Sequence, residues 1–480
     1  MMHRQSADAC GHRIRPARLG AFARLACLAP PVALALVCAS APARAETISG
    51  ALARAYENSP DLNAQRANTR AIDENVPKAM AGYRPTVTYN QSLGYQYTNE
   101  QLPGASHASS AGAFPRTEQL QVTENLYNGN RTVNGVRQAD SQIDAAREQL
   151  RLTELTLLDN AATFYMNVLR DTAILDLDRN NVRVLRQQLK FTTDQFQVGE
   201  VTRTDVANAQ AALATGQATA FQAQSNLENS IANYRQYVGV EPHDLQPARP
   251  LESLVPHSLE AAIADAMSNH PSIQMALHNA DVAQYAVKEA EGALLPTLGV
   301  TGSVTKENDP QGVPNESLFS GAVMANLTVP LYDGGVTYAD IRQAKEQYGQ
   351  ARLQVDLARD QVRAQLVSAW GVWQNARAVI QAQRAAVRAA AIALTGTREE
   401  AKVGQRTTLD VLNAQQALLN ARVNLVSAQR DRVVGSYSVL AAIGRLSAGE
   451  LGLHVVRYDP TVHFSQVKDK WFGVDTPDGR

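Results

Sequence analysis

Two short sequence motifs contain the polar residues whose types and spacing suggest a chemical role. Thr202 and Asp205 are three residues apart, and Thr407 and Asp410 repeat this spacing. A threonine followed three residues later by an acidic residue is typical of the start of a helix, where each side chain bonds the other residue's backbone N–H. A Val-Gly pair precedes each motif, and glycine readily ends a helix. The motifs therefore predict two tight turns between helices, and capping accounts for both aspartates.

Other residue types that could catalyse reactions or bind metals lack the required spacing. The nine histidines form no His-Glu-x-x-His or comparable ligand pattern, and we interpret His270 and His278 as ordinary surface residues. No phosphate-binding glycine loop and no nucleophile elbow occurs. All three cysteines lie at the N-terminus, in a segment that we expect to be removed. We therefore predict a protein that is not an enzyme and has no metal site and no cofactor.

Residues 1–45 have the features of a secretory signal peptide. Arginines at positions 13, 15, 18 and 24 precede an apolar run, and Ala43-Arg44-Ala45 offers a small-x-small cleavage site. The cysteines near this site lack the neighbouring residues of a lipoprotein signal. We expect cleavage after Ala45, which would leave a mature chain without cysteine.

The net charge and the hydropathy of the chain narrow the classes of protein that remain possible. The formal net charge of the 480 residues is -1, so no basic excess indicates nucleic acid as a partner. Beyond the signal peptide, no stretch of about 18 apolar residues could form a transmembrane helix. A periplasmic, a secreted or a barrel-type outer-membrane protein remains.

The chain after residue 45 repeats itself. Asn-Ser-Pro at 58–60 recurs as Asn-His-Pro at 269–271 with an offset of 211, and Val-Gly at 198–199 recurs at 403–404 with an offset of 205. A length difference in one loop explains the change of offset. The sequence therefore predicts two structural repeats followed by a tail, with bounds 46–255, 256–444 and 445–480, and we expect the tail to be equatorial or disordered.

Each repeat is expected to contain a helix, a strand hairpin, a long helix, a tight tip and a returning helix. Period-two alternation of apolar residues indicates the hairpins. The long helices lack proline over ~67 residues, or ~100 Å at 1.5 Å per residue. Trp370 and Trp373 lie midway along the second long helix and are expected to pack there. The predicted bounds are 47–80 for the first helix, 85–127 and 296–331 for the hairpins, 131–198 and 337–403 for the long helices, and 198–205 and 403–410 for the tips.

Four strands per chain predict an oligomer. Strand runs of roughly 10–13 residues match the length of a tilted membrane strand. Four strands cannot close a barrel, and a membrane tolerates no open sheet edge. Three copies would supply twelve strands, which is within the range of closed outer-membrane barrels. The predicted fold class is an α+β membrane protein, with a trimeric 12-stranded barrel continued by a long α-helical coiled coil.

This layout, together with the sequences of the two tips, resembles the TolC family of outer-membrane channel-tunnels. The resemblance covers essentially the whole mature chain. It implies a homotrimer whose barrel lies in the lipid of the outer membrane and whose helical tunnel extends into the periplasm. It also implies partners, namely a periplasmic adaptor protein and an inner-membrane pump of the ABC or RND type. The family exports proteins by type I secretion, or drugs and other small molecules by efflux.

The resemblance also assigns roles to residues of the tips. The family's closed gate joins an arginine, here Arg406, to a Thr-Asp pair of a neighbouring chain, here Thr204 and Asp205. An entrance ring of carboxylates matches Asp410, whereas its second aspartate is replaced by Asn413. The family's gate tyrosine is replaced by Ala401. The adaptor-docking element matches Val198, Gly199 and Thr202 in the first tip, and Val403, Gly404 and Thr407 in the second.

A secreted or periplasmic coiled-coil scaffold or adhesin without channel activity is the alternative. It would explain the long helices and the signal peptide. It would not explain two hairpins at matching positions of both repeats, nor the paired tips. A scaffold should also be soluble without detergent, so extraction separates the two hypotheses.

Overall fold

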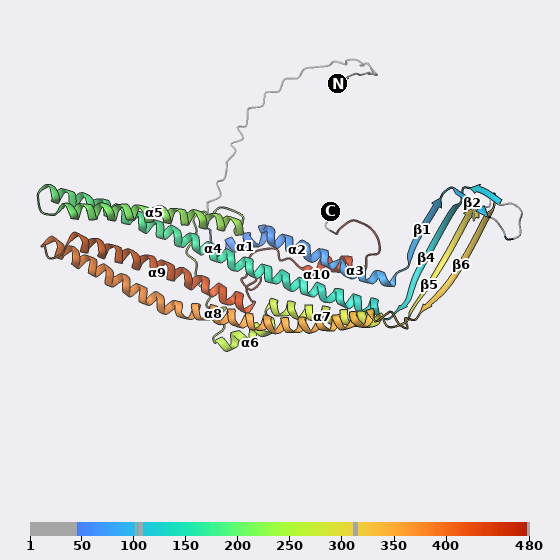
Figure 1. The fold of residues 1–480 in the computed structure, drawn as a ribbon. Coiled ribbons are helices and arrows are strands. Elements are labelled where there is room, and N and C mark those ends of the chain that lie inside the picture. Colours follow the sequence, from blue (N-terminus) through green and yellow to red (C-terminus); the bar gives the residue numbers. More distant parts are fainter. Residues whose placement is uncertain (1–45, 101–102, 104–108, 311–314, 478–480) are drawn as a thin grey trace, which may run out of the picture. The chain divides into compact units, whose positions relative to one another are not determined.

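Two pairs of long antiparallel helices and a four-stranded sheet dominate the computed structural model (Figure 1), which describes residues 46–100, 103, 109–310 and 315–477. The expected signal peptide, 1–45, lies outside the described residues. The elements before the strands are α1 (Ile48–Asn58), α2 (Pro60–Asp73), α3 (Asn75–Met80) and the 3-10 turn η1 (Ala81–Tyr83). The strands are β1 (Thr86–Leu93), β2 (Gln96–Glu100), β3 (Ser109–Ala113), β4 (Arg116–Asn128), β5 (Thr297–Asn308) and β6 (Ser317–Thr328). The remaining helices are α4 (Arg131–Gln197), α5 (Arg203–Val238), α6 (Leu259–Asn269), α7 (Pro271–Gly292), α8 (Val336–Lys402), α9 (Thr408–Ile443) and α10 (Pro460–Val467).

The long helices α4 and α8 each contain 67 residues. These bounds differ by at most one residue at each end from the 131–198 and 337–403 predicted from the sequence. The part of each long helix that leads to the tip packs against the helix that returns from that tip, α5 or α9. Trp370 is buried midway along α8, and its ring meets that of Trp373 edge to face at 5.1 Å. The packing role expected for these two tryptophans is confirmed.

Prolines divide the helices that precede the strands. The sequence predicts one helix over 47–80, but the structure has three, and the corresponding part of the second repeat is divided into α6 and α7. Pro60 and Pro271 each occupy the first turn of a new helix, where the missing N–H costs no hydrogen bond. The residue before each proline is extended, as the proline ring requires.

His270 is buried, so its interpretation as a surface residue is wrong. It caps α7 by accepting a hydrogen bond from the backbone N–H of Ser272, at 3.2 Å from Nδ1. Its ring also lies close to Gly444, just after α9. Burial, with a smaller contribution from Arg151, lowers the pKa of His270 to about 4. The imidazole is therefore neutral at physiological pH and acts as a structural acceptor.

Four of the strands form an antiparallel sheet in the order β1-β4-β5-β6, in which β4 of the first repeat pairs with β5 of the second. The first hairpin is not the simple pair of strands expected from the sequence, because each of its sides is divided into two strands. Gly94 separates β1 from β2, and Pro115 separates β3 from β4, so that β2 and β3 pair separately. Proline removes a donor from the ladder and glycine offers no side chain to pack, which together weaken the pairing at this position.

The main core lies where α1, α6 and the C-terminal ends of α5 and α9 pack against the middle of α4 and α8. Tyr165 and Tyr234 are fully buried there. The hydroxyl of Tyr165 lies 2.8 Å from the carbonyl oxygen of Glu46 and 2.7 Å from that of Gln246, and the hydroxyl of Tyr234 donates to the Glu46 carboxylate at 2.5 Å. Two of these three bonds hold Glu46, the first described residue, in the core.

The described part of the tail, 445–477, includes the short helix α10, which packs against α2. His463 of α10 lies 2.9 Å from the carboxylate of Asp73 in α2, and both side chains are buried. This pair fastens the tail to the first repeat.

Candidate functional site

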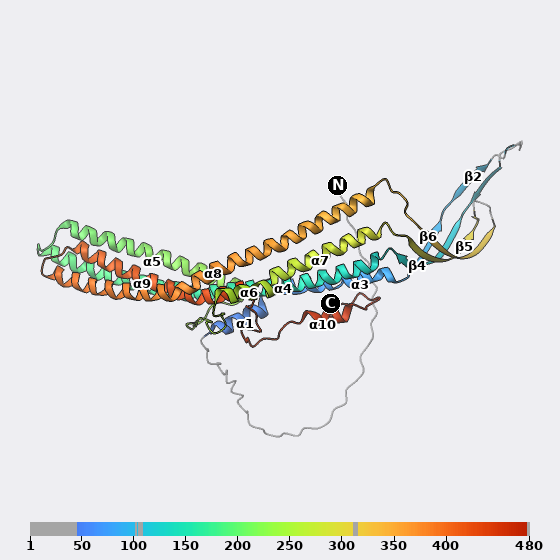
Figure 2. The same cartoon turned by 90° about the horizontal axis from the view of Figure 1, so that it is seen from below.

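Two helix-hairpin tips form the candidate site. The first tip, 198–205, joins α4 to α5, and the second tip, 403–410, joins α8 to α9. Figures 1 and 2 show both tips at the end of the helices that is farthest from the strands. Gly199 and Gly404 have φ angles of 81° and 78°, a left-handed conformation that costs little only for glycine. The glycine prediction for both turns is confirmed.

Both predicted capping boxes are present. At the first tip, Asp205 Oδ2 accepts the backbone N–H of Thr202 at 2.9 Å, and Thr202 Oγ1 accepts the backbone N–H of Asp205 at 3.3 Å. At the second tip, Thr407 and Asp410 repeat these bonds at 3.0 and 3.2 Å. Hydrogen bonds from the side chain and backbone of Thr202 lower the pKa of Asp205, and those from the backbone and side chain of Thr407 lower that of Asp410. Both carboxylates are therefore ionised at neutral pH.

Capping occupies only one oxygen of each aspartate. The bonds to Asp205 and Asp410 all end on Oδ2. Oδ1 of each residue has no hydrogen-bond partner among the described residues. A second interaction with a cation or a guanidinium group is therefore compatible with the cap at either tip.

The expected docking residues expose apolar groups on both tips. Val198 and Val403 have 72% and 70% of their surface exposed. The next residue in each tip is the left-handed glycine, and the capping threonine follows three positions later. The two repeats thus present the same small apolar and hydroxyl surface twice.

Arg406 contacts a residue that sequence reasoning missed. Its Nε donates to Glu400 Oε2 at 2.8 Å, across the turn of the second tip. This pair, more than Asp410 nearby, raises the pKa of Arg406. Within one chain Arg406 does not reach the first tip, and Thr204 there is exposed. The structure therefore places the three residues expected to form the gate at two tips of one chain, without joining them.

Ala401 and Asn413 lie on different sides of the second tip. Ala401 is partly buried against the apolar side chains of Leu394, Val411 and Leu418. Asn413 is exposed on the second turn of α9, three residues after Asp410. The alanine thus contributes to packing inside the hairpin, whereas the asparagine faces solvent beside the ionised carboxylate.

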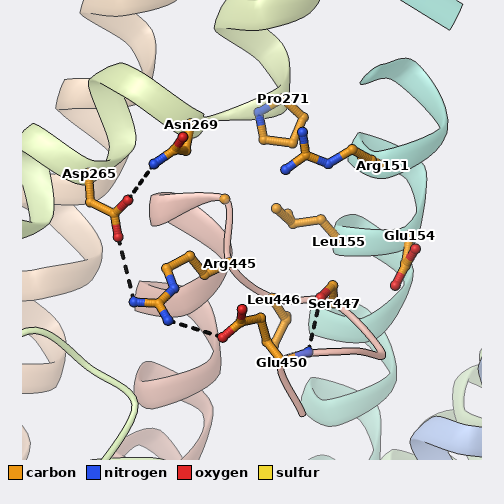
Figure 3. Close-up of a pocket in the computed structure, with 11 residues that line it drawn as sticks. Arg151, Glu154, Leu155, Asp265, Asn269, Pro271, Arg445, Leu446, Ser447 and Glu450 are labelled. Atoms are coloured by element: carbon orange, nitrogen blue, oxygen red, sulfur yellow. Dashed lines mark hydrogen bonds and ion pairs between the residues drawn. The ribbon is translucent and has the colours of Figure 1, made fainter. Parts of the chain in front are cut away.

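A separate pocket of about 410 Å³ lies between α4, α6 and the segment after α9 (Figure 3). Arg445 pairs there with Asp265 and Glu450 at 3.7 and 3.0 Å. Glu154 accepts the backbone N–H of Ala448 at 2.8 Å, and Arg151 pairs with Glu148. Because these charges already have partners within the chain, this pocket is a structural network joining the repeats.

Two features are absent from the described residues. No group of three or more His, Cys, Asp or Glu residues within them is arranged to hold a metal ion. None of their helices carries an apolar stretch long enough to cross a membrane.

Comparison with known proteins gives consistent matches. The family model described as "Outer membrane efflux protein" matches residues 51–240 and 262–445. The outer membrane efflux protein BepC of Brucella suis is 41% identical over 440 residues, which cover 91% of this chain and 94% of BepC. The outer membrane protein TolC of Escherichia coli is 26% identical and covers 88% of this chain and 86% of TolC. The crystal structure of the Campylobacter jejuni CmeC outer membrane channel has a TM-score of 0.76 at 17% identity, over 88% of this chain and 89% of CmeC.

Proposed function

Because this chain belongs to the outer membrane efflux protein family, we propose that it forms the outer-membrane exit duct of a tripartite efflux pump or a type I secretion system. The duct is passive, and its gate lies at the periplasmic helical tips. Its partners are a periplasmic adaptor and an inner-membrane pump of the ABC or RND type. Because BepC is named an efflux protein, small-molecule export is the first activity to assay.

The two open edges of the sheet carry this proposal. β1 and β6 are the outer strands of the four-stranded sheet, and every residue of both is exposed in the single chain. Their exposed side chains include Val87, Leu93, Phe319 and Val323. An apolar sheet with unpaired edges is unstable in lipid, where every backbone polar group needs a partner. Pairing of β6 in one copy with β1 in the next satisfies both edges and closes a ring.

We expect the detergent-solubilised protein to be a trimer. Three copies supply twelve strands, a number found in closed membrane barrels. Mass measurement by light scattering, with the detergent contribution subtracted, tests this directly. A monomer or dimer would contradict the architecture, and a protein extracted without detergent would favour the coiled-coil scaffold instead.

In the trimer the tips perform two separate tasks. Val198, Gly199 and Thr202, with their repeat equivalents Val403, Gly404 and Thr407, form the surface on which the adaptor docks. Arg406 closes the duct by bonding Thr204 and Asp205 of the neighbouring chain. The free Oδ1 of Asp205 supports this arrangement, because the carboxylate can cap α5 and accept from a guanidinium group at the same time.

Asp410 and Asn413 are expected to control ion selectivity in opposite directions. Three ionised Asp410 carboxylates at a narrow entrance attract cations, so Asp410→Asn should reduce cation preference. Asn413→Asp adds three charges beside them and should increase it. The test measures the reversal potential under a salt gradient for both variants and for the parent protein. Opposite shifts support the ring, whereas identical potentials would leave Asp410 only its capping role.

A further inference from the structure

An open groove on the first helix hairpin combines positive charge with an exposed aromatic ring. It lies between α4 and α5 and has a volume of about 710 Å³. Arg179, Arg183 and Arg186 line its α4 side, and Phe221 lines its α5 side with 75% of its surface exposed. The three arginines are spaced by four and three residues, which places them in one row along the helix.

The guanidinium groups of this row have no acidic partner among the described residues. Arg179 donates to the side-chain oxygen of Gln224 at 2.8 Å, and Arg183 donates to that of Asn180 at 3.2 Å. Both acceptors are neutral amides, and Arg186 makes no hydrogen bond at all within the described chain. One carboxylate, that of Asp176, lines the groove at its end, without an ion pair to any of the three arginines in the structure.

A band of both hairpins, which begins just after Asp176 and Asp178 and extends toward the tips, contains no carboxylate. Asp and Glu are absent from 179–193 and 206–225 and from the repeat-related segments 384–398 and 411–430, whereas these four segments hold nine arginine and lysine residues. In a ring of identical chains, neighbouring copies present the same band at the same height. The same band of a second copy therefore offers no carboxylate to the row of arginines.

The second repeat lacks the same groove surface. The first two arginines have repeat equivalents in Arg384 and Arg388, but the third falls at Ala391 and Phe221 falls at Val426. The third cation and the exposed aromatic ring thus distinguish one hairpin from a related one of the same length. A partner that requires both features would bind only the first hairpin.

We propose that this groove binds an acidic amphipathic helix of a different, periplasmic protein. A helix lying along α4 with Glu or Asp spaced by four and three residues places each carboxylate opposite one arginine. Apolar residues on the adjacent stripe of that helix cover Phe221, and an aromatic side chain at such a contact supplies much of the binding energy. The inference rests on the proposed function only in placing the groove in the periplasm, and the groove is separate from the docking surface at the tips.

The test uses the full-length protein in detergent and two synthetic helical peptides. One peptide carries Glu at the four-three spacing beside a leucine stripe, and its twin carries Lys in place of Glu. Fluorescence anisotropy should detect binding of the Glu peptide alone, with weaker binding at higher ionic strength because exposed charges are screened. Equal binding of the Lys peptide, or no binding of the Glu peptide, would overturn the proposal.

Variants locate the binding surface. The triple variant Arg179→Gln, Arg183→Gln, Arg186→Gln should lose about tenfold in affinity, since each exposed pair contributes a few-fold. Phe221→Ser should weaken binding without changing charge. The control triple Arg384→Gln, Arg388→Gln, Arg422→Gln removes the same charge from the same band outside the groove and should bind as the parent does. An equal loss of affinity in the control would mean that general electrostatic attraction explains the binding. It would refute the groove as the binding site.

Conductance in lipid bilayers separates this proposal from the proposed function. All groove variants should conduct like the parent, because the altered side chains lie away from the tips. If the parent itself forms no channel, the duct function fails whatever the peptides do. If every protein conducts and none binds the Glu peptide, only the groove assignment fails.

Discussion

Replacing Arg406 with alanine is expected to raise the single-channel conductance of the trimer in lipid bilayers several-fold. In the proposed closed state, three copies of this arginine tie the second tips to Thr204 and Asp205 of neighbouring chains. Ala401 replaces the family's gate tyrosine here, and it packs inside its own hairpin. Fewer bonds therefore hold the closed state, and each arginine accounts for a larger share of them.

Glu400 should contribute to the same gate through Arg406. The carboxylate holds Nε of the guanidinium group, which leaves both terminal nitrogens available to a neighbour. Ordering a long side chain before it binds reduces the conformational entropy that binding costs. Glu400→Gln should therefore raise conductance less than Arg406→Ala does, and it should have no further effect in a protein that already carries Arg406→Ala.

Two matched controls make this result specific. Glu399→Gln removes a charge from the adjacent position, where the carboxylate pairs with Lys402 instead. Arg398→Ala removes an exposed arginine that bonds the neutral side chain of Gln415. Both should conduct like the parent. Unchanged conductance of Arg406→Ala in a correctly assembled trimer would mean that the gate lies elsewhere, and a lower conductance of Glu400→Gln would mean that Glu400 competes for the arginine.

Local sequence patterns were sufficient for the features whose causes are local. The turn glycines and capping boxes depend on a few consecutive residues, so Gly199 and the Thr202–Asp205 pair could be predicted from their spacing alone. The absence of proline indicated α4 and α8 for the same reason. The interruption at Gly94 also had a local signal, since glycine weakens a strand, but the alternation on both sides of it favoured a continuous strand.

Features that depend on distant packing could not be predicted in this way. His270 is buried because the chain after α9 returns to lie against it at Gly444, 174 residues later in the numbering. The bond between Glu400 and Arg406 forms because the left-handed turn at Gly404 brings residues six positions apart together. The first repeat gives a partial signal, because Gln195, the repeat equivalent of Glu400, makes a similar contact with Glu200 across the first tip. Without the turn geometry, the charges of the second tip could be paired in several ways.

The close approach of two glycines at the junction of helices and strands leads to the second large effect. Gly129 ends β4 with a φ of 69°, and Gly292 ends α7 just before β5. A Cβ atom added to Gly292 would lie 2.4 Å from the carbonyl oxygen of Gly129, and one added to Gly129 would lie 2.1 Å from that of Gly292. Both obstacles are backbone atoms, which cannot move aside as a side chain can. The two repeats are therefore in contact, backbone to backbone, where the sheet meets the helices.

Gly292→Ala should destabilise the protein by about 1–3 kcal/mol, the usual range for overpacking a well-packed site. In a helix interior the same substitution ordinarily stabilises by roughly 0.5–1 kcal/mol, so the sign of the effect is diagnostic. Gly135→Ala in α4 is the matched control, because a Cβ there meets nothing within 4 Å. The temperature at which the trimer dissociates in detergent should fall for Gly292→Ala and stay level or rise for Gly135→Ala. Equal temperatures for both variants would show that the junction can relax and that the register of the sheet does not depend on this contact.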